Sequence, residues 1–125
     1  EQLEPFVDFS ALNEQTTQQI QASWPGPNTW LIPAKKQTPT WLRGKHATLA
    51  VRVTDHPIAK GLCEAASSAI VSTSANISNH PPALNSKQCR IIFRQQLDHI
   101  VAGEVDLNAK PSTIRDALTG KLIRA

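Results

Sequence analysis

The sequence has few of the residues that would point to metal or disulfide chemistry. It contains no methionine and only two cysteines, Cys63 and Cys89, in 125 residues. Their separation matches no zinc-ligand spacing, which argues against a structural zinc site. Both lie in stretches with a helical pattern, where a buried thiol is the simpler interpretation. Reduced thiols fit a cytoplasmic protein, and that is the location we expect.

Long apolar runs are also absent. None approaches the roughly 20 residues that a membrane helix needs, so we expect no membrane association. The first residues, "EQLEPFVDF", have neither the basic nor the apolar region of a signal peptide. Because no initiator methionine is present, we expect a fragment or a processed chain.

Two common catalytic patterns are missing as well. No Gly-x-Ser-x-Gly elbow occurs, which argues against a serine hydrolase of that type. No Gly-x-x-x-x-Gly-Lys loop occurs, so any ATP must be held by other means. The histidines are scattered and mark no catalytic partner: His46, His56, His80 and His99.

The remaining composition is that of a globular protein. Hydrophobic residues make up 40% and charged residues 18%, and the length suits one domain over residues 1–125. The net charge is +3 and the isoelectric point about 9.1. This mild basicity suits an anionic ligand or an RNA partner, although many proteins with neither share it.

Local patterns predict alternating helices and strands. In the first half we expect a helix from Ser10 to about residue 23, ended by the prolines that follow, and a strand over 29–34. Residues 35–47 read as a polar, mobile loop. Alternation over 48–53 predicts a strand, and 54–66 a helix with Asp55 as its cap and Pro57 in its first turn.

The second half continues this pattern. A strand over 68–73 would complete a strand–helix–strand unit, which favours a parallel pair with a right-handed crossover. We expect a helix over 86–97, a short strand over 99–104, and two strands within 111–125 joined through residues 118–120. The predicted class is therefore α/β or α+β with a mixed sheet.

The stretch "IVSTSANIS", residues 70–78, places small polar side chains directly after a predicted strand. Ligands of open α/β sheets lie beyond the carboxyl ends of the strands. Short hydroxyls and free backbone N–H groups there can bind phosphate or carboxylate oxygens closely. An ordinary turn with local side-chain hydrogen bonds remains an equal alternative.

Arg52 is the second unusual residue, because it lies near the end of an apolar strand. A guanidinium matches a carboxylate with two parallel hydrogen bonds, so Arg52 could hold a ligand carboxylate. An outward-facing arginine is the alternative, and the alternation of the strand permits it.

Four blocks together resemble a known family: "SWPGPNTWLIPA", "TLAVRVTDHPIAKGLC", "IVSTSANIS" with the following Pro-Pro, and "PSTIRDALTGKLIR". In this order they are similar to the YrdC-like threonylcarbamoyl-AMP synthases of the bacterial TsaC type. The resemblance implies a twisted, mixed parallel and antiparallel sheet with flanking helices around a concave, positively charged cavity. It also implies synthesis of threonylcarbamoyl-AMP and diphosphate from L-threonine, bicarbonate or CO2, and ATP with Mg²⁺.

The resemblance carries roles over to particular residues. It implies contacts with ATP for Thr48, Ser74, Asn76 and Arg124, and with L-threonine for Arg52, Ser72 and Ser112. It identifies no general base and no metal-ligating side chain. The implied partners are tRNA or double-stranded RNA and a threonylcarbamoyl transferase complex, which modifies tRNAs reading codons that begin with A.

The sequence departs from the family pattern at two places. The resemblance begins partway into the family domain, so we expect the domain to be N-terminally truncated, without the family's Lys-x-Arg segment. Ser78-Asn79 stands where the family has Ser-Gly, and asparagine tolerates the left-handed conformation of that turn.

Two other functions remain open. One is a non-catalytic RNA-binding module of the same fold, which the missing segment and the basic isoelectric point favour. The other is a carbamoyl-transfer domain of hydrogenase maturation, which would require acylphosphatase and zinc-finger modules.

Overall fold

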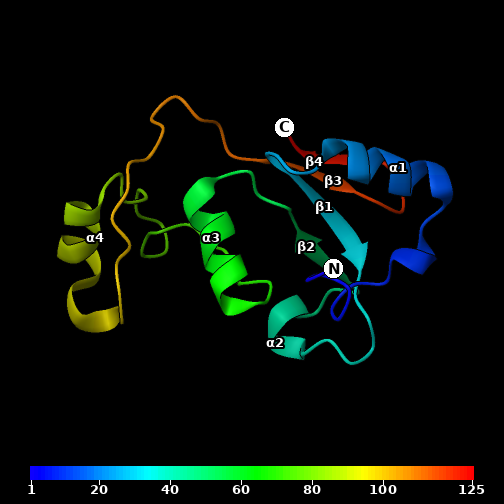
Figure 1. Cartoon of the computed structure of the whole chain (residues 1–125), viewed down its shortest axis with the longest axis horizontal. Coiled ribbons are helices and arrows are strands. Elements are labelled where there is room, and N and C mark those ends of the chain that lie inside the picture. Colours follow the sequence, from blue (N-terminus) through cyan, green and yellow to red (C-terminus); the bar gives the residue numbers. More distant parts are fainter. The chain divides into compact units, whose positions relative to one another are not determined.

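The computed structural model describes all residues from 1 to 125, and the chain divides into two compact units. The first unit contains residues 1–69 and 111–125, and the second contains residues 70–110. Each unit is described by itself below, and Figure 1 gives the labels of the helices and strands.

The first unit is built on a four-stranded sheet, and its mixed parallel and antiparallel pairing is the one that the sequence predicts. Its strands are β1 (Asn28–Pro33), β2 (Thr48–Val51), β3 (Thr113–Asp116) and β4 (Leu122–Arg124), in the order β2-β1-β3-β4. β1 pairs antiparallel with β2 and parallel with β3, and β3 pairs antiparallel with β4. The predicted hairpin at the C-terminus is confirmed, and its turn places Gly120 at a φ of 73°.

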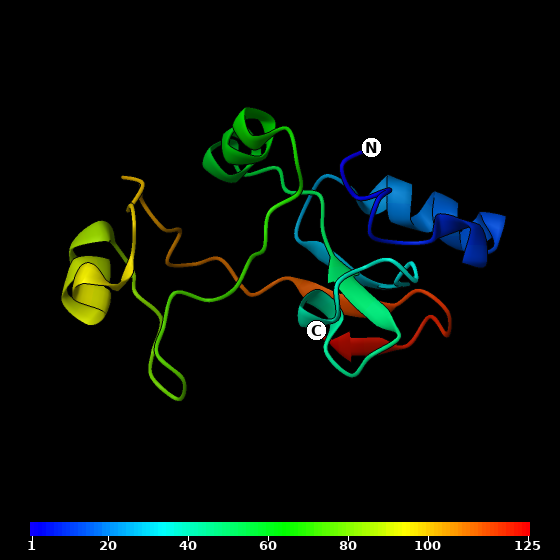
Figure 2. The same cartoon turned by 90° about the horizontal axis from the view of Figure 1, so that it is seen from below.

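The core of this unit lies on β1 and its neighbours. Trp30 and Ile32 alternate along β1 with less buried residues, and Ile32 is fully buried. The core cluster is completed by Val7, Ile20, Val51 and Ala117. Ile20 comes from α1 (Glu14–Ser23), which lies along the sheet in both Figure 1 and Figure 2.

The start of the first helix differs from the sequence prediction. Residues Phe9–Ala11 form a short 3-10 helix, η1, in which Asp8 accepts the N–H of Ser10. α1 begins later, because the Asn13 side chain accepts the N–H of Thr16 at 2.8 Å. Asn13 therefore caps the helix in place of the predicted Ser10, and asparagine is among the strongest N-caps.

Two further helices belong to the first unit. The stretch predicted as a mobile loop contains a single helical turn, α2 (Thr40–Arg43), so that prediction is wrong there. α3 (Pro57–Ala66) matches the predicted helix, with Pro57 in its first turn. Its cap is His56 rather than Asp55, because the His56 ring nitrogen accepts the N–H of Ile58 at 3.2 Å.

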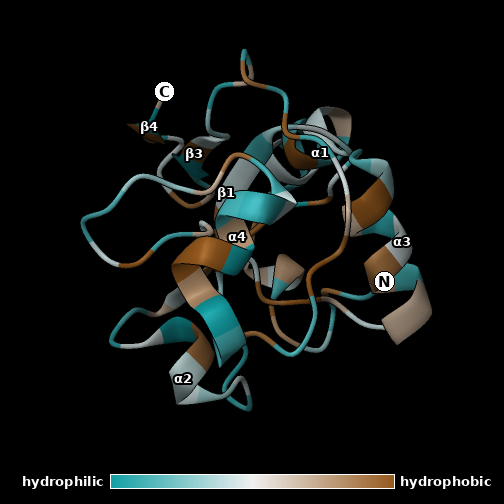
Figure 3. Cartoon of the chain, turned by 90° about the vertical axis from the view of Figure 1, so that its left-hand side faces the viewer, coloured by the Kyte–Doolittle hydropathy of each residue, from teal (hydrophilic) through white to brown (hydrophobic).

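The second unit contains α4 (Ser86–Phe93) and a 3-10 turn, η2 (Arg94–Gln96). α4 matches the predicted helix, and Asn85 caps it through the N–H of Gln88 at 2.8 Å. Figure 3 shows hydrophobic and hydrophilic residues together on this helix. The residues of the unit are exposed or half-buried, so its apolar side chains form no buried core.

Two predicted strands do not form. Residues 68–73 and 99–104 lie outside the sheet and carry no ladder hydrogen bonds. The predicted parallel crossover from β2 is therefore wrong, and β1 pairs in parallel with β3 instead. An apolar pair such as Ile70-Val71 favours extended backbone, but a strand also needs a neighbouring strand to accept and donate its hydrogen bonds.

None of the helices combines the length and the apolar character that a membrane span requires.

Candidate functional site

Two predicted site residues, Ser112 and Arg124, are in direct contact at one end of the sheet. The Arg124 guanidinium donates to the Ser112 carbonyl oxygen from Nε at 3.1 Å and from Nη2 at 2.8 Å. The Ser112 hydroxyl lies 2.8 Å from the Thr29 hydroxyl at the start of β1. We call Thr29, Ser112 and Arg124 the sheet-end cluster. Its hydroxyls and guanidinium can bind anionic oxygens.

The register of the sheet places Arg52 at the same end. Val51 pairs with Trp30, so Arg52 lies one residue beyond that pair while Thr29 lies one residue before it. Ser112 directly precedes β3 on the other side of β1. Arg52 and Ser112 therefore flank Thr29 from opposite neighbouring strands. Arg52 is exposed, as the outward-facing alternative predicts.

Thr48 lies at the opposite end of β2. It pairs with Pro33, the last residue of β1, whereas the sheet-end cluster lies at the first residues of β1. Thr48 and Arg52 are four positions apart along extended chain, which is roughly 13 Å at the usual rise per residue. Within the first unit, three of the four predicted site residues thus share one end of the sheet, and Thr48 does not.

The remaining predicted residues lie in the second unit, where Ser74 and Asn76 form a tight turn. The Ser74 hydroxyl donates to the Asn76 side-chain oxygen, and the Asn76 backbone N–H donates to the Ser74 carbonyl at 3.0 Å. The Asn76 amide nitrogen donates to the Ile77 carbonyl at 3.0 Å. These are the local hydrogen bonds that the turn alternative predicts. Ser72 and Ser74 are exposed, so their hydroxyls remain open to solvent.

The turn continues through Asn79, which stands where the family has glycine. Asn79 adopts a φ of 66°, so the prediction of a left-handed asparagine is confirmed. The Ala83 N–H donates to the Ala75 carbonyl at 2.8 Å and closes the loop between them. This bond fixes the backbone around the Ser-Ala-Asn sequence.

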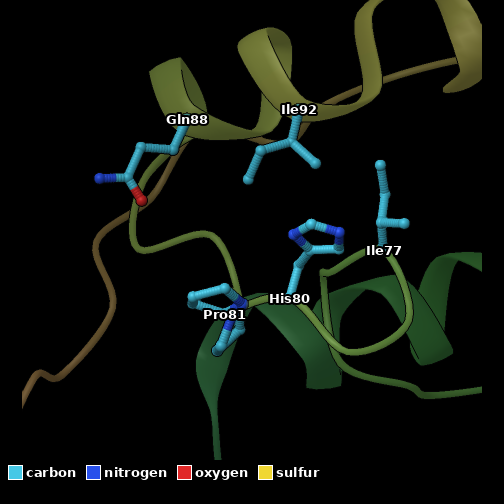
Figure 4. A pocket seen from close by; sticks show the side chains of 6 residues that line it. Ile77, His80, Pro81, Gln88 and Ile92 are labelled. Carbon is cyan, nitrogen blue, oxygen red and sulfur yellow. The ribbon is translucent and has the colours of Figure 1, made fainter.

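Each unit contains an open pocket. The pocket in the second unit has a volume of about 330 Å³. In Figure 4 the His80 ring lies between α4 and Pro81. The pocket in the first unit has a volume of about 170 Å³. Neither is lined by a predicted site residue. The pocket in the second unit is mostly apolar. The pocket in the first unit carries three cationic side chains: Lys35, Lys36 and Arg43.

One titratable group has a pKa displaced from its ordinary value. The pKa of Asp8 lies below 3.8, first because the Ser10 hydroxyl donates to the carboxylate, and further because Lys35 lies nearby. Elsewhere, no three histidine, cysteine, aspartate or glutamate side chains gather where they could hold a metal ion.

Sequence reasoning missed two residues of the sheet end. Thr29 bonds the Ser112 hydroxyl, and the Asn28 side-chain oxygen accepts the hydroxyl of Thr113 at 3.2 Å. Thr29 belongs to the predicted strand over 29–34 and Asn28 directly precedes it, and neither is predicted as a site residue. Two polar side chains at the start of an apolar strand were the available signal of a site. Their partners could not be identified, because these lie 83 and 85 residues away in sequence.

A family model described as "Telomere recombination", for Sua5, YciO and YrdC proteins, matches residues 1–125. The threonylcarbamoyl-AMP synthase of Yersinia pestis (strain Pestoides F) is 46% identical over 123 residues, which are 98% of this chain and 64% of the relative. That of Alkalilimnicola ehrlichii is 49% identical over 127 residues, 99% of this chain and 65% of the relative. The chain thus spans somewhat less than two thirds of the length of these curated relatives.

Solved structures show the same fold. Sua5 of P. abyssi in complex with L-threonine has a TM-score of 0.80 and 30% identity, over 92% of this chain and 33% of that one. A doubly substituted form of Sua5 from P. abyssi has a TM-score of 0.83 and 29% identity, over 93% and 35%. YciO of E. coli, with a TM-score of 0.80 and 24% identity over 98% and 60%, supports the fold alone. On the match of the family model along its whole length, this chain belongs to the Sua5/YciO/YrdC family.

Proposed function

We propose that the protein is a threonylcarbamoyl-AMP synthase. The observation that carries the proposal is the identity of 46% to 49% over nearly the whole chain with relatives that bear this name. The relatives do not favour the non-catalytic RNA-binding alternative. The match of the family model across residues 1–125 supports treating both units as parts of one YrdC-like domain.

The threonine side of the proposed site consists of Arg52, Ser72 and Ser112. Arg52 and Ser112 flank Thr29 at one end of the sheet, where a guanidinium and two hydroxyls suit a carboxylate and an amino-acid hydroxyl. The structure of Sua5 with L-threonine supports an amino acid as the ligand class. Ser72 is assigned by resemblance.

The ATP side of the proposed site consists of Ser74, Asn76 and Arg124, and of Thr48, which lies at the other end of β2 and is assigned by resemblance. The exposed Ser74 hydroxyl and the Ser-Ala-Asn backbone offer small groups that let a nucleotide approach closely. Arg124 offers a cation to the phosphates. These hydroxyl, amide and guanidinium groups suit phosphate oxygens and do not suit a bare cation, so we assign Mg²⁺ to the phosphates themselves.

The chemistry proposed for this site needs little from the side chains. The neutral amine of threonine attacks the carbon of CO2 and gives up one proton to solvent, which forms a carbamate. With bicarbonate a hydroxide leaves from the same carbon and departs with that proton as water. A carbamate oxygen then attacks the α-phosphorus of ATP, and diphosphate leaves. Positioning and charge neutralisation dominate such a transfer, which fits a ring of serine, threonine, asparagine and arginine without a general base.

The proposed biological setting follows from the product. Threonylcarbamoyl-AMP would supply a transferase complex that modifies tRNAs reading codons that begin with A. We therefore propose tRNA and this complex as partners, and the cytoplasm as the location.

Exchange between ATP and labelled diphosphate tests the proposal. We expect exchange only when L-threonine and bicarbonate are both present, with L-serine in place of threonine as a control for the amino acid. Absence of threonine-dependent exchange in a folded protein that still binds tRNA would contradict the synthase and support the RNA-binding alternative.

A further inference from the structure

The sheet of the first unit has two faces, and only one of them carries the core. Trp30 and Ile32 of β1 point to the core face, where Ile20 of α1 belongs to the same cluster. Successive side chains of a strand point to opposite faces of its sheet. Thr29 and Leu31 of β1 therefore point to the other face, which we call the open face.

Ile114 of β3 lies on the open face beside Thr29. The parallel register pairs Thr29 with Ile114, and paired residues of neighbouring strands point to the same side of a sheet. The same register pairs Trp30 with Arg115, and the Arg115 guanidinium lies over the Trp30 ring, 6.0 Å from its centre, in agreement with this alternation. Ile114 is half-buried and belongs neither to the core cluster nor to the apolar side chains packed against it.

Three polar side chains surround Ile114 on this face, and they form the sheet-end cluster. Thr29 pairs with Ile114 from β1, and Arg124 pairs with it from β4. Ser112 precedes Ile114 by two positions, so both side chains point to the same side, roughly 7 Å apart at the usual rise per residue. The hydrogen bond of 2.8 Å between the Thr29 and Ser112 hydroxyls agrees with this placement. An apolar side chain thus lies among two hydroxyls and a guanidinium.

The pair of hydroxyls keeps hydrogen-bonding capacity for a ligand. Each hydroxyl has one donor and two acceptor sites, and the bond between Thr29 and Ser112 uses one donor and one acceptor. The Arg124 Nη2 lies 3.4 Å from the Ser112 hydroxyl oxygen, which is a long and weak contact. One hydroxyl hydrogen and further lone pairs therefore remain available beside Ile114.

The apolar surface continues from Ile114 across the open face. Leu31 follows Thr29 by two positions in β1, and it pairs with Ala50 of β2. Leu31 is half-buried and Ala50 is exposed, and neither belongs to the core cluster. The apolar side chains of β3, β1 and β2 thus begin at the sheet-end cluster with Ile114 and extend away from it.

This arrangement matches the two substituents of the threonine side chain. L-threonine carries a hydroxyl and a methyl group on one carbon, whereas L-serine carries the hydroxyl without the methyl. The hydroxyl can bond to Thr29 and Ser112, and the methyl group is stabilised by an apolar neighbour that removes it from water. Ile114 is the apolar side chain that adjoins both hydroxyls, because it pairs with Thr29 and lies two positions after Ser112.

We propose that Ile114 is a specificity-determining residue for the amino-acid substrate. Its side chain contacts the methyl group of threonine, while the hydroxyls of Thr29 and Ser112 bond the threonine hydroxyl. This inference rests on the proposed function, which takes threonine as the amino acid, and it adds the residue that separates threonine from serine. One methyl group in an apolar site changes specificity by roughly 10- to 200-fold, so threonine should bind at least about tenfold more tightly than serine.

Isothermal titration calorimetry of the full chain with three amino acids tests the proposal. L-Serine lacks the methyl group, and L-allo-threonine carries the methyl and the hydroxyl in exchanged positions. We expect L-threonine to bind about tenfold or more tightly than either. Ile114→Ala should weaken threonine binding about tenfold and leave serine binding unchanged, so the preference for threonine is lost. Ile114→Val, which keeps a branched apolar side chain, should retain most of the preference.

Two further variants guard against a merely structural effect. Ile123→Ala in β4 is the matched control, because Ile123 is 52% exposed and directly precedes Arg124, so it points away from the open face. It should change neither affinity. Ile114→Thr keeps a branched side chain that suits a strand but places a hydroxyl among the cluster, and it should also lose the preference for threonine. Circular dichroism checks the folding of each variant.

Threonine-dependent exchange of ATP with diphosphate separates this inference from the proposed function. If threonine is bound selectively through Ile114 but supports no exchange, the synthase proposal fails and the role of Ile114 is supported. Three results would overturn the role of Ile114: equal affinity of the native protein for threonine and serine, equal affinity for threonine and allo-threonine, and an equal loss of threonine and serine binding in Ile114→Ala. Binding of none of the amino acids would overturn both proposals.

Discussion

The Arg124 guanidinium holds the Ser112 carbonyl oxygen with two hydrogen bonds, at 3.1 and 2.8 Å, across the pair of strands β3 and β4. The two residues are 12 positions apart in sequence. Arg124 thereby fixes the backbone of the residue whose hydroxyl faces Thr29. A cation that we propose for ATP and a hydroxyl that we propose for threonine are therefore coupled through one peptide group.

Ser112→Ala should raise the KM for threonine about tenfold and change the KM for ATP less. The substitution removes the hydroxyl that lies 2.8 Å from that of Thr29, and the lost hydrogen bond should also cost about 1 kcal/mol of unfolding free energy. Initial rates of threonine-dependent exchange and urea unfolding measure the two effects. Thr40→Ala, at an exposed position of the same unit, is the control. Equal increases in both KM values would argue against a threonine contact.

Arg52→Ala should weaken threonine binding more than ATP binding. A charge-assisted bond to a carboxylate contributes about 1.5–3 kcal/mol, which corresponds to roughly 10- to 100-fold in affinity. Isothermal titration calorimetry with each substrate measures the difference. Arg90→Ala, which removes an exposed arginine of α4, should leave both affinities unchanged. An equal loss for both substrates would show that Arg52 does not select the amino acid.

Ser74→Ala should reduce ATP affinity, by about fivefold or more, because its hydroxyl both bonds the Asn76 side chain and is exposed to a ligand. Thr73→Ala, one residue away and also exposed, is the matched control. Equilibrium dialysis with labelled ATP measures both variants. If Thr73→Ala lowers the affinity as much as Ser74→Ala, the loss reflects the loop as a whole and not this hydroxyl.

Ile32→Val should lower the unfolding free energy by about 1 kcal/mol, because Ile32 is fully buried in the core of the first unit. Ile123→Val makes the same chemical change in β4 at a side chain that is 52% exposed, and should cost much less. Urea denaturation followed by tryptophan fluorescence measures both. Equal costs would mean that the core is not centred on β1.

Asp8→Asn should flatten the dependence of stability on pH in the acid range. The folded-state pKa of Asp8 lies below its ordinary value of 3.8, so its contribution is complete above that value. The contribution is lost as the pH falls through the folded-state pKa, and native protein and variant should then converge. Thermal midpoints between about pH 6 and about pH 2 measure this, with Asp98→Asn as the control. A constant difference at every pH would exclude the carboxylate charge as its source.

Local patterns in the sequence determined much of the secondary structure. Pro57 and the spacing of apolar residues predicted α3, and alternation over 48–53 predicted β2. A strand was also expected where β1 lies, and residues 118–120 were expected to join the hairpin of β3 and β4. These features depend on neighbours a few residues away, which is why they can be read without the fold. The Ser-Ala-Asn sequence marked the turn for the same reason.

Tertiary structure alone decided which strands exist and which polar residues meet. Residues 68–73 have the composition of a strand but lie outside the sheet, while β1 takes β3, whose paired residues are 85 positions further along the chain, as its parallel neighbour. The hydroxyl contact of Thr29 with Ser112 depends on that pairing. A strand is completed by hydrogen bonds to a partner, and the choice of partner depends on burial across the whole sheet rather than on the local sequence.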